Sequence, residues 1–148
     1  MADSTAEADS FVQLLTPTGQ YREHAEYSVD LTEDEYRDLY RDLVIVRRLD
    51  AESTTLQRQG ELGLWASLLG QEAAQIGSGR ALASQDVVFP SYREHGVAWC
   101  RGVNHVDILK MFRGIDHCSW SAEEHNFHLY TIVIGSQTLH ATGYAMGL

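Results

Sequence analysis

The sequence is organised around one stretch, which reads Phe89-Pro90-Ser91-Tyr92-Arg93-Glu94-His95-Gly96. The apolar residues before it predict a buried extended segment, and Pro90 ends that segment because proline has no N–H to donate to a sheet. Arg93 then offers a planar fork that matches phosphate oxygens, and Tyr92 adds a hydroxyl donor. The pair is therefore predicted to bind an anion. The alternative is a surface turn in which Arg93 pairs with Glu94 or another carboxylate.

Composition and charge exclude several classes of protein. The chain has 148 residues, of which 44% are hydrophobic and 22% charged, as in a soluble globular domain. Its net charge of −10 argues against a nucleic-acid partner, which needs a basic surface. The sequence has neither a long apolar span nor a basic-then-apolar leader, so we expect no membrane partner and a cytoplasmic location. Cys100 and Cys118 are too few for a disulfide framework.

The first part of the chain is predicted to be a tail followed by a helix. Residues 1–30 are predicted to form an extended tail, because the small and acidic residues at its start cannot bury themselves. Residues 31–148 are predicted to be part of one domain. A helix is predicted from Thr32, which forms a capping box with Glu35, to the late fifties, ending at Gly60.

Three further helices are predicted around the central stretch. One runs from Gly70 to about Ala83 and carries a stripe of small residues, which indicates tight helix packing. A short helix follows Gly96. Another is capped by Asn104 and ended by Gly114. In the first helix of the domain, we expect Arg47 and Arg48 to be solvated or interface charges rather than ligand-binding residues.

The last part of the chain is predicted to contain a functional or mobile loop, because Ile115–His125 is polar, carries imidazole groups and has no periodicity. Phe127–Ile134 is predicted as a second buried extended segment. A last helix with another stripe of small residues begins at about Ser136. It reaches Leu148 without a pattern that ends helices, so we interpret the chain as a fragment. Helices that alternate with short buried strands indicate the α/β class.

Metal and thiol chemistry find little support in the sequence. His117, Cys118, His125 and His128 do not have the spacing of common zinc sites, so no metal ligand is predicted. Cys118 could pair with His117 or His95 as a nucleophile and base. However, adjacent residues on an extended chain point apart, and no acidic residue is placed to orient the imidazole.

A family resemblance rests on four motifs that occur in order and at suitable distances: Leu56-Gln57-Arg58-Gln59-Gly60, Gly70-Gln71-Glu72-Ala73, the central stretch 89–96, and Ile134-Gly135-Ser136-Gln137. Together they resemble the alpha subunit of the decarboxylating component of 2-oxo acid dehydrogenase complexes. The alpha subunits of pyruvate and branched-chain 2-oxo acid dehydrogenases are both similar, over about residues 10–148. The resemblance implies the N-terminal part of a doubly wound thiamine diphosphate-binding fold, mostly helical with short buried strands.

The resemblance also implies roles for particular residues. Tyr92 and Arg93 match the pair that grips the diphosphate of the cofactor. Ile132 and Ile134 match positions whose backbone meets the aminopyrimidine, and Ile134 matches the bulky residue that holds the cofactor bent. His95 is assigned a catalytic role in proton handling or in anchoring the nearby loop, and a purely structural histidine stays open as the alternative.

The implied activity is decarboxylation of a 2-oxo acid, with pyruvate preferred over branched-chain substrates, and transfer of the acyl group to a lipoyl arm. The implied partners are a beta subunit, in a heterotetramer of two alpha and two beta subunits, and the lipoyl acyltransferase component. The magnesium ligands of the family, a Gly-Asp-Gly motif and a later asparagine, would lie beyond Leu148. We therefore expect the chain alone to be inactive. A catalytically inactive module that docks on partner subunits is the alternative.

Overall fold

The protein divides into two units in a computed structural model that describes residues 12–148: one ends at Tyr36, and the other runs from Arg37 to Leu148. Part of the predicted tail, residues 1–11, lies outside the described residues. Between residues 12 and 30 the chain has no helix. Leu15 and Tyr21 form an isolated antiparallel bridge across a turn in which Gly19 has a φ of +80°. The boundary at residue 30 stays a prediction.

Helix α1 (Glu33–Arg58) begins and ends as the sequence predicts. The backbone N–H of Thr32 donates to Glu35 at 2.7 Å, and the N–H of Glu35 donates to the Thr32 hydroxyl at 3.3 Å. These reciprocal bonds are the capping box expected from the sequence. After the helix, Gly60 adopts a φ of +78°, a left-handed conformation that glycine accepts without steric cost.

The buried side of α1 carries carboxylates that the apolar pattern did not predict. Asp42 and Asp50 are buried, whereas Tyr40, which belongs to the apolar repeat, is exposed. Asp42 accepts hydrogen bonds from Arg80 Nε at 2.7 Å and from Trp99 Nε1 at 2.9 Å. A carboxylate can remain buried when donors replace its water, so these contacts hold the helix against the rest of the unit.

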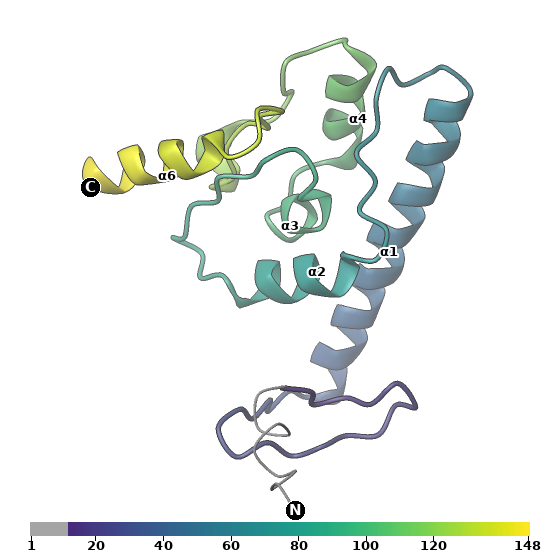
Figure 1. Ribbon diagram of the computed structural model, residues 1–148, viewed down its shortest axis with the longest axis vertical. Coiled ribbons are helices and arrows are strands. Elements are labelled where there is room, and N and C mark those ends of the chain that lie inside the picture. The colour runs from purple at the N-terminus through teal and green to yellow at the C-terminus, as the bar shows by residue number, and fades with distance from the viewer. Residues whose placement is uncertain (1–11) are drawn as a thin grey trace, which may run out of the picture. The chain divides into compact units, whose positions relative to one another are not determined.

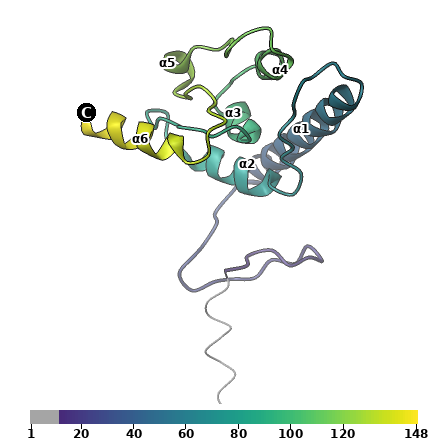
Figure 2. The ribbon, with the colours of Figure 1, turned by 45° about the horizontal axis from the view of Figure 1, so that its top comes forward.

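Three helices follow: α2 (Glu72–Ala81), α3 (His95–Cys100) and α4 (His105–Arg113). In both ribbon views α3 lies between α2 and α4 (Figure 1, Figure 2). The predicted ends of α4 are confirmed, because the Asn104 side chain accepts from the N–H of Val106 at 2.9 Å and Gly114 is left-handed. The main hydrophobic core contains residues of α3 and α4 and includes Trp65, Phe112 and Phe127.

Of the two glycines in α2, one lies in close contact with a neighbouring helix. A Cβ atom on Gly79 would lie 2.9 Å from the Cβ of Cys100 in α3, which is too close for a side chain. A Cβ atom on Gly77 would meet nothing within 4 Å, and the same holds for Gly143 in helix α6 (Ser136–Met146). The predicted tight packing is therefore confirmed at Gly79, while the stripe on α6 has no such contact among the described residues.

The predicted strands are reduced to a single bridge in this unit. Val88 donates its N–H to the carbonyl of Asn126 at 2.9 Å and accepts from the N–H of His128 at 2.8 Å, which makes an isolated parallel bridge between Val88 and Phe127. No hydrogen-bonded ladder continues from it within residues 12–148, so the described chain is mostly helical. The predicted α/β class with short buried strands is correct in its helical part only.

Two details of the C-terminal half differ from the predictions. The segment Phe127–Ile134 is buried at its start, but Ile132 and Ile134 are 61% and 81% exposed, because no described residue covers them. The polar loop after residue 114 contains a short helix, α5 (Ala122–His125), which Ser121 caps by accepting from the N–H of Glu124 at 3.2 Å. Helix α6 then projects away from α1 (Figure 1).

Candidate functional site

The turn after Pro90 is held by the carboxylate of Glu94. It accepts hydrogen bonds from the backbone N–H groups of Ser91 at 2.9 Å and of Arg93 at 3.0 Å. These bonds satisfy backbone donors just before α3 begins. Within the described chain no ion pair joins the Arg93 guanidinium to a carboxylate, so Glu94 shapes the turn without neutralising its neighbour.

The predicted anion-binding pair keeps free donors in this turn. Arg93 Nη1 donates to the carbonyl of Ser67 at 2.6 Å, and its guanidinium carbon lies 5.7 Å from the ring centroid of Tyr92. Tyr92 is half-buried and packs against the main core. Among residues 12–148, the other guanidinium nitrogens and the Tyr92 hydroxyl have no hydrogen-bond partner. These groups can therefore donate to an anion.

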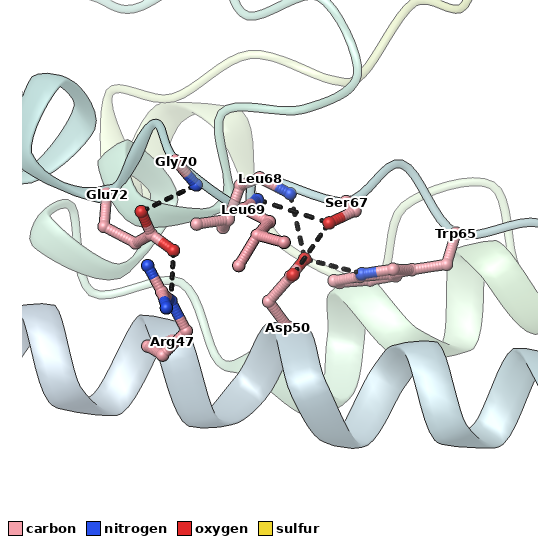
Figure 3. A network of polar contacts seen from close by, with 8 residues as sticks. All are labelled: Arg47, Asp50, Trp65, Ser67, Leu68, Leu69, Gly70 and Glu72. Atoms are coloured by element: carbon pink, nitrogen blue, oxygen red, sulfur yellow. Dashed lines mark hydrogen bonds and ion pairs between the residues drawn. The ribbon is translucent and has the colours of Figure 1, made fainter.

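The floor under Arg93 is the segment Trp65–Leu68, and Asp50 of α1 holds it. The Asp50 carboxylate accepts from Trp65 Nε1 at 2.9 Å, from the Ser67 hydroxyl at 2.8 Å and from the backbone N–H of Leu68 at 2.9 Å (Figure 3). One buried side chain thereby fixes three points of an irregular segment. The carbonyl of Ser67 is consequently held in place for Arg93.

An ion pair between Arg47 and Glu72 fastens the start of α2 to α1. Glu72, whose side chain is buried, accepts from Arg47 Nε and from the backbone N–H of Gly70, the latter at 2.9 Å (Figure 3). The hydrogen bond from Arg47 lowers the pKa of Glu72, so the carboxylate is ionised at neutral pH. Arg47 thus has a structural partner, whereas Arg48 pairs with Glu52 on the helix surface.

His95 is fully buried, and both of its ring nitrogens are engaged. Nε2 lies 2.9 Å from the carbonyl oxygen of Ala66, and Nδ1 lies 2.8 Å from the hydroxyl of Tyr130. The ring stacks on Trp65 with centroids 4.4 Å apart. Burial lowers the pKa of His95 to about 4, so the imidazole is neutral at physiological pH. The catalytic role assigned to His95 stays a prediction.

The two segments predicted to bind opposite ends of the cofactor lie side by side. Beyond the bridge at Val88, the N–H of Thr131 donates to the carbonyl of Ser91 at 2.7 Å. Ser91 directly precedes the Tyr92–Arg93 pair, and Thr131 directly precedes Ile132. The backbone alone therefore brings together residues that lie about 40 positions apart in the sequence.

A cavity of about 700 Å³ opens beside this junction. Its walls include Tyr130 and Ile132 on one side and Ile115 and His117 of the polar loop on the other. The lining is mainly apolar, with Asp116 as its acidic group, whose pKa is lowered by a hydrogen bond from the backbone of His117. The loop that is predicted from the sequence to be functional or mobile thus borders a space next to the predicted pyrimidine-facing residues.

The thiols and imidazoles do not form a reactive cluster. In the described part of the chain, no three metal-ligating side chains gather in one place. Burial raises the pKa of the Cys118 thiol, which disfavours the nucleophilic thiolate, and the sulfur lies 3.6 Å from that of Met111. None of the helices among residues 12–148 is long and apolar enough to cross a membrane.

Comparisons with known proteins point to one family. The family model described as "Dehydrogenase E1 component" matches residues 40–148. The chain is 42% identical over 135 residues to the 3-methyl-2-oxobutanoate dehydrogenase subunit alpha of Mycobacterium tuberculosis (strain CDC 1551 / Oshkosh), covering 91% of this chain and 37% of the relative. It is 35% identical over 136 residues to the pyruvate dehydrogenase E1 component subunit alpha of Bacillus subtilis (strain 168), covering 92% and 36%.

A third relative is the pyruvate dehydrogenase E1 component subunit alpha of Staphylococcus epidermidis (strain ATCC 35984 / DSM 28319 / BCRC 17069 / CCUG 31568 / BM 3577 / RP62A). It is 36% identical over 119 residues, covering 80% of this chain and 32% of the relative. The chain therefore spans about a third of the length of the curated relatives it matches.

Proposed function

Because the chain belongs to the dehydrogenase E1 component family, we propose that it is the N-terminal part of the alpha subunit of a thiamine diphosphate-dependent 2-oxo acid dehydrogenase. The observation that carries the proposal is the hydrogen bond of 2.7 Å from Thr131 to Ser91. It joins the segment predicted to hold the diphosphate to the segment predicted to meet the aminopyrimidine. In the complete domain, we propose that the Val88–Phe127 bridge belongs to the parallel sheet of a doubly wound fold.

The residues present are suited to the diphosphate end of thiamine diphosphate. Arg93 keeps guanidinium donors and Tyr92 keeps its hydroxyl, and charge-assisted bonds of this kind suit phosphate oxygens. When bound, the cofactor supplies an electron sink for decarboxylation of a 2-oxo acid. The backbone of Ile132 and Ile134 would meet the pyrimidine, and the Ile134 side chain would hold the bend and exclude water. Magnesium would be held by residues outside this chain.

The contacts of His95 support its alternative as a structural histidine rather than proton handling or anchoring of the loop Ile115–His125. A general base needs a nitrogen that faces the reacting proton. Both nitrogens of His95 instead contact protein groups, Ala66 and Tyr130, and the ring has no solvent exposure. We therefore propose that His95 holds Tyr130 and the backbone of Ala66 in place and does not contact the substrate.

Exposed apolar residues support the proposal of partner subunits. Ile134, Leu139 and Met146 are all more than 70% exposed and lie on or before α6. Such a surface is typical of an interface in a larger assembly. We propose that the rest of the alpha subunit and a beta subunit cover it, in a cytoplasmic enzyme that passes its acyl group to a lipoyl acyltransferase component.

The substrate is proposed to be pyruvate, with a branched-chain 2-oxo acid as the second candidate. The second candidate is favoured by the 42% identity to the 3-methyl-2-oxobutanoate dehydrogenase subunit, compared with 35% for the pyruvate dehydrogenase subunit of Bacillus subtilis. Decarboxylation rates measured with pyruvate and with 3-methyl-2-oxobutanoate as separate substrates would distinguish them.

The proposal is tested by producing the complete alpha subunit that contains this sequence together with its beta subunit. We expect release of carbon dioxide from a 2-oxo acid that depends on thiamine diphosphate. Arg93→Ala should raise the dissociation constant of the cofactor roughly ten- to a hundredfold, because a hydrogen bond to a charged group is lost. Arg58→Ala, at the exposed end of α1, is the matched control and should leave binding unchanged. Unaltered binding by Arg93→Ala would contradict the proposal.

The alternative function, an inactive module that docks on partner subunits, is supported by the same exposed apolar surface. It predicts that the 148-residue chain binds a beta subunit while the assembled complex neither binds thiamine diphosphate nor decarboxylates a 2-oxo acid. Under the enzyme proposal, the 148-residue chain alone is inactive but the complete assembly is active. Decarboxylation by the isolated chain would contradict both.

A further inference from the structure

Tyr130 stands where the two halves of the proposed site meet. It lies one residue before the Thr131–Ser91 hydrogen bond and two before Ile132. Its ring packs edge-on against Trp120, Phe127 and His95, with centroids 5.4, 5.8 and 5.5 Å apart. Among the described residues, the hydroxyl of Tyr130 has one hydrogen-bond partner, Nδ1 of His95 at 2.8 Å.

The direction of this hydrogen bond follows from the other side of the imidazole. The carbonyl oxygen of Ala66 can only accept, so Nε2 of His95 must carry a hydrogen. A neutral imidazole then has a lone pair at Nδ1, and the Tyr130 hydroxyl must donate to it. A continuous chain of bonds therefore runs from Tyr130 through His95 to the backbone of the Trp65–Leu68 segment.

We propose that Tyr130 is a positioning residue for the cofactor: through His95, its hydroxyl fixes the pyrimidine-facing segment at Ile132 and Ile134 relative to the turn that carries Tyr92 and Arg93. This inference rests on the proposed function. The bonds at Val88 and Thr131 hold this segment through its backbone only. The bond from Tyr130 adds a side-chain contact on the buried side of the chain, two residues before Ile132.

The test uses the assembled enzyme with the variant Tyr130→Phe, which keeps the ring and removes the hydroxyl. The dissociation constant is measured for thiamine diphosphate and for thiazole diphosphate, a fragment that lacks the aminopyrimidine. We expect the constant for thiamine diphosphate to rise roughly three- to tenfold, as for the loss of one neutral hydrogen bond. The constant for thiazole diphosphate should be unchanged, because Tyr92 and Arg93 are left intact.

A general loss of structure would weaken both ligands equally, so equal weakening overturns the inference. Tyr40→Phe, on the exposed side of α1, is the matched control and should change neither constant. Equal binding of thiamine diphosphate by Tyr130→Phe and the wild type would also overturn the inference while leaving the proposed function intact. If the wild-type assembly binds no thiamine diphosphate, the proposed function fails and this inference fails with it.

A second measurement examines the hydrogen bond itself by ¹⁵N NMR of histidine in the chain. In the wild type, the Nδ1 resonance of His95 should be that of a hydrogen-bonded acceptor nitrogen. In Tyr130→Phe the Nδ1 resonance should move toward the position of a free acceptor nitrogen. Nε2 should stay protonated and still donate to the carbonyl oxygen of Ala66. An Nδ1 resonance that does not move would show that Tyr130 does not hold the imidazole, and the inference would be wrong.

Discussion

The two ends of the proposed cofactor site are built in different ways. At the end that carries Arg93, polar groups of the floor segment have hydrogen-bond partners within the chain. Asp50 accepts three hydrogen bonds from this segment, and both ring nitrogens of His95 are engaged. The other end, at Ile132 and Ile134, is apolar and exposed. Under the proposed function, this contrast predicts that the diphosphate end is preformed within the chain, whereas the pyrimidine end would need further residues to cover it.

The largest effect is expected from Asp50, because removing its carboxylate strands buried donors. In Asp50→Ala the indole N–H of Trp65 and the backbone N–H of Leu68 lose their acceptor. We expect the free energy of unfolding in urea to fall by about 3 kcal/mol or more. Asp50→Asn keeps one acceptor oxygen and should lose less. An Asp50→Ala variant as stable as Asp50→Asn would show that the floor is not held in this way.

The next effect is a dependence of stability on pH through His95. Its folded pKa of about 4 lies below the ordinary 6.5, so the unfolded chain binds more protons between these values. Stability is therefore complete above about pH 6.5 and falls as the pH drops toward 4. Between pH 6.5 and pH 5 the wild type should lose about 1.5 kcal/mol more than His95→Gln, which cannot titrate. Parallel pH profiles of the two proteins, measured by urea unfolding, would contradict this.

A smaller effect is expected where α2 meets α3. Gly79→Ala places a Cβ against Cys100, and overpacking of this kind should cost about 1 to 2 kcal/mol in thermal or urea unfolding. Gly77→Ala meets open space in the same helix. That control should instead gain roughly 0.5 to 1 kcal/mol from the higher helix propensity of alanine. Equal changes in the two variants would mean that the helices do not approach closely at Gly79.

The smallest change in stability is expected at the exposed end, where a change in binding should appear instead. Ile134→Ala removes an exposed side chain, so the stability of the chain should change by no more than about 0.5 kcal/mol. In the assembled enzyme the same variant should bind thiamine diphosphate more weakly. Val133→Ala, its exposed neighbour with no predicted contact to the cofactor, is the control for binding. Equal cofactor affinities in the two variants would remove the special role of Ile134.

The sequence predicted the local features of this fold well. The ends of α1 and α4 depend on contacts within a few residues, such as Thr32 with Glu35 and Asn104 with Val106, so their residue types were sufficient. The helix α5 was missed, although Ser121 followed by Glu124 has the spacing of a capping box and could have revealed it.

Contacts between distant parts of the chain were not predictable in the same way. Asp42 is buried because Trp99, 57 residues away, donates to it, and no local pattern announces that partner. Tyr92 and Arg93 were recognised as anion-ready from their chemistry, but the carbonyl of Ser67 that holds Arg93 was not. The exposure of Ile132 and Ile134 was missed because an apolar pattern predicts burial but does not show which part of a protein covers the residues.

The hydrogen bond between Thr131 and Ser91 joins two main-chain atoms, so it does not depend on which side chains these positions carry. Any side chain except proline leaves an N–H at position 131, so substitutions around the cavity can alter its size and polarity without separating the two halves of the site. Under the proposed function, the side chains around the cavity can then vary while this bond keeps the two halves of the site together. Thr131→Pro is the replacement expected to separate the two halves, with loss of cofactor binding by the assembled enzyme as the measurable result.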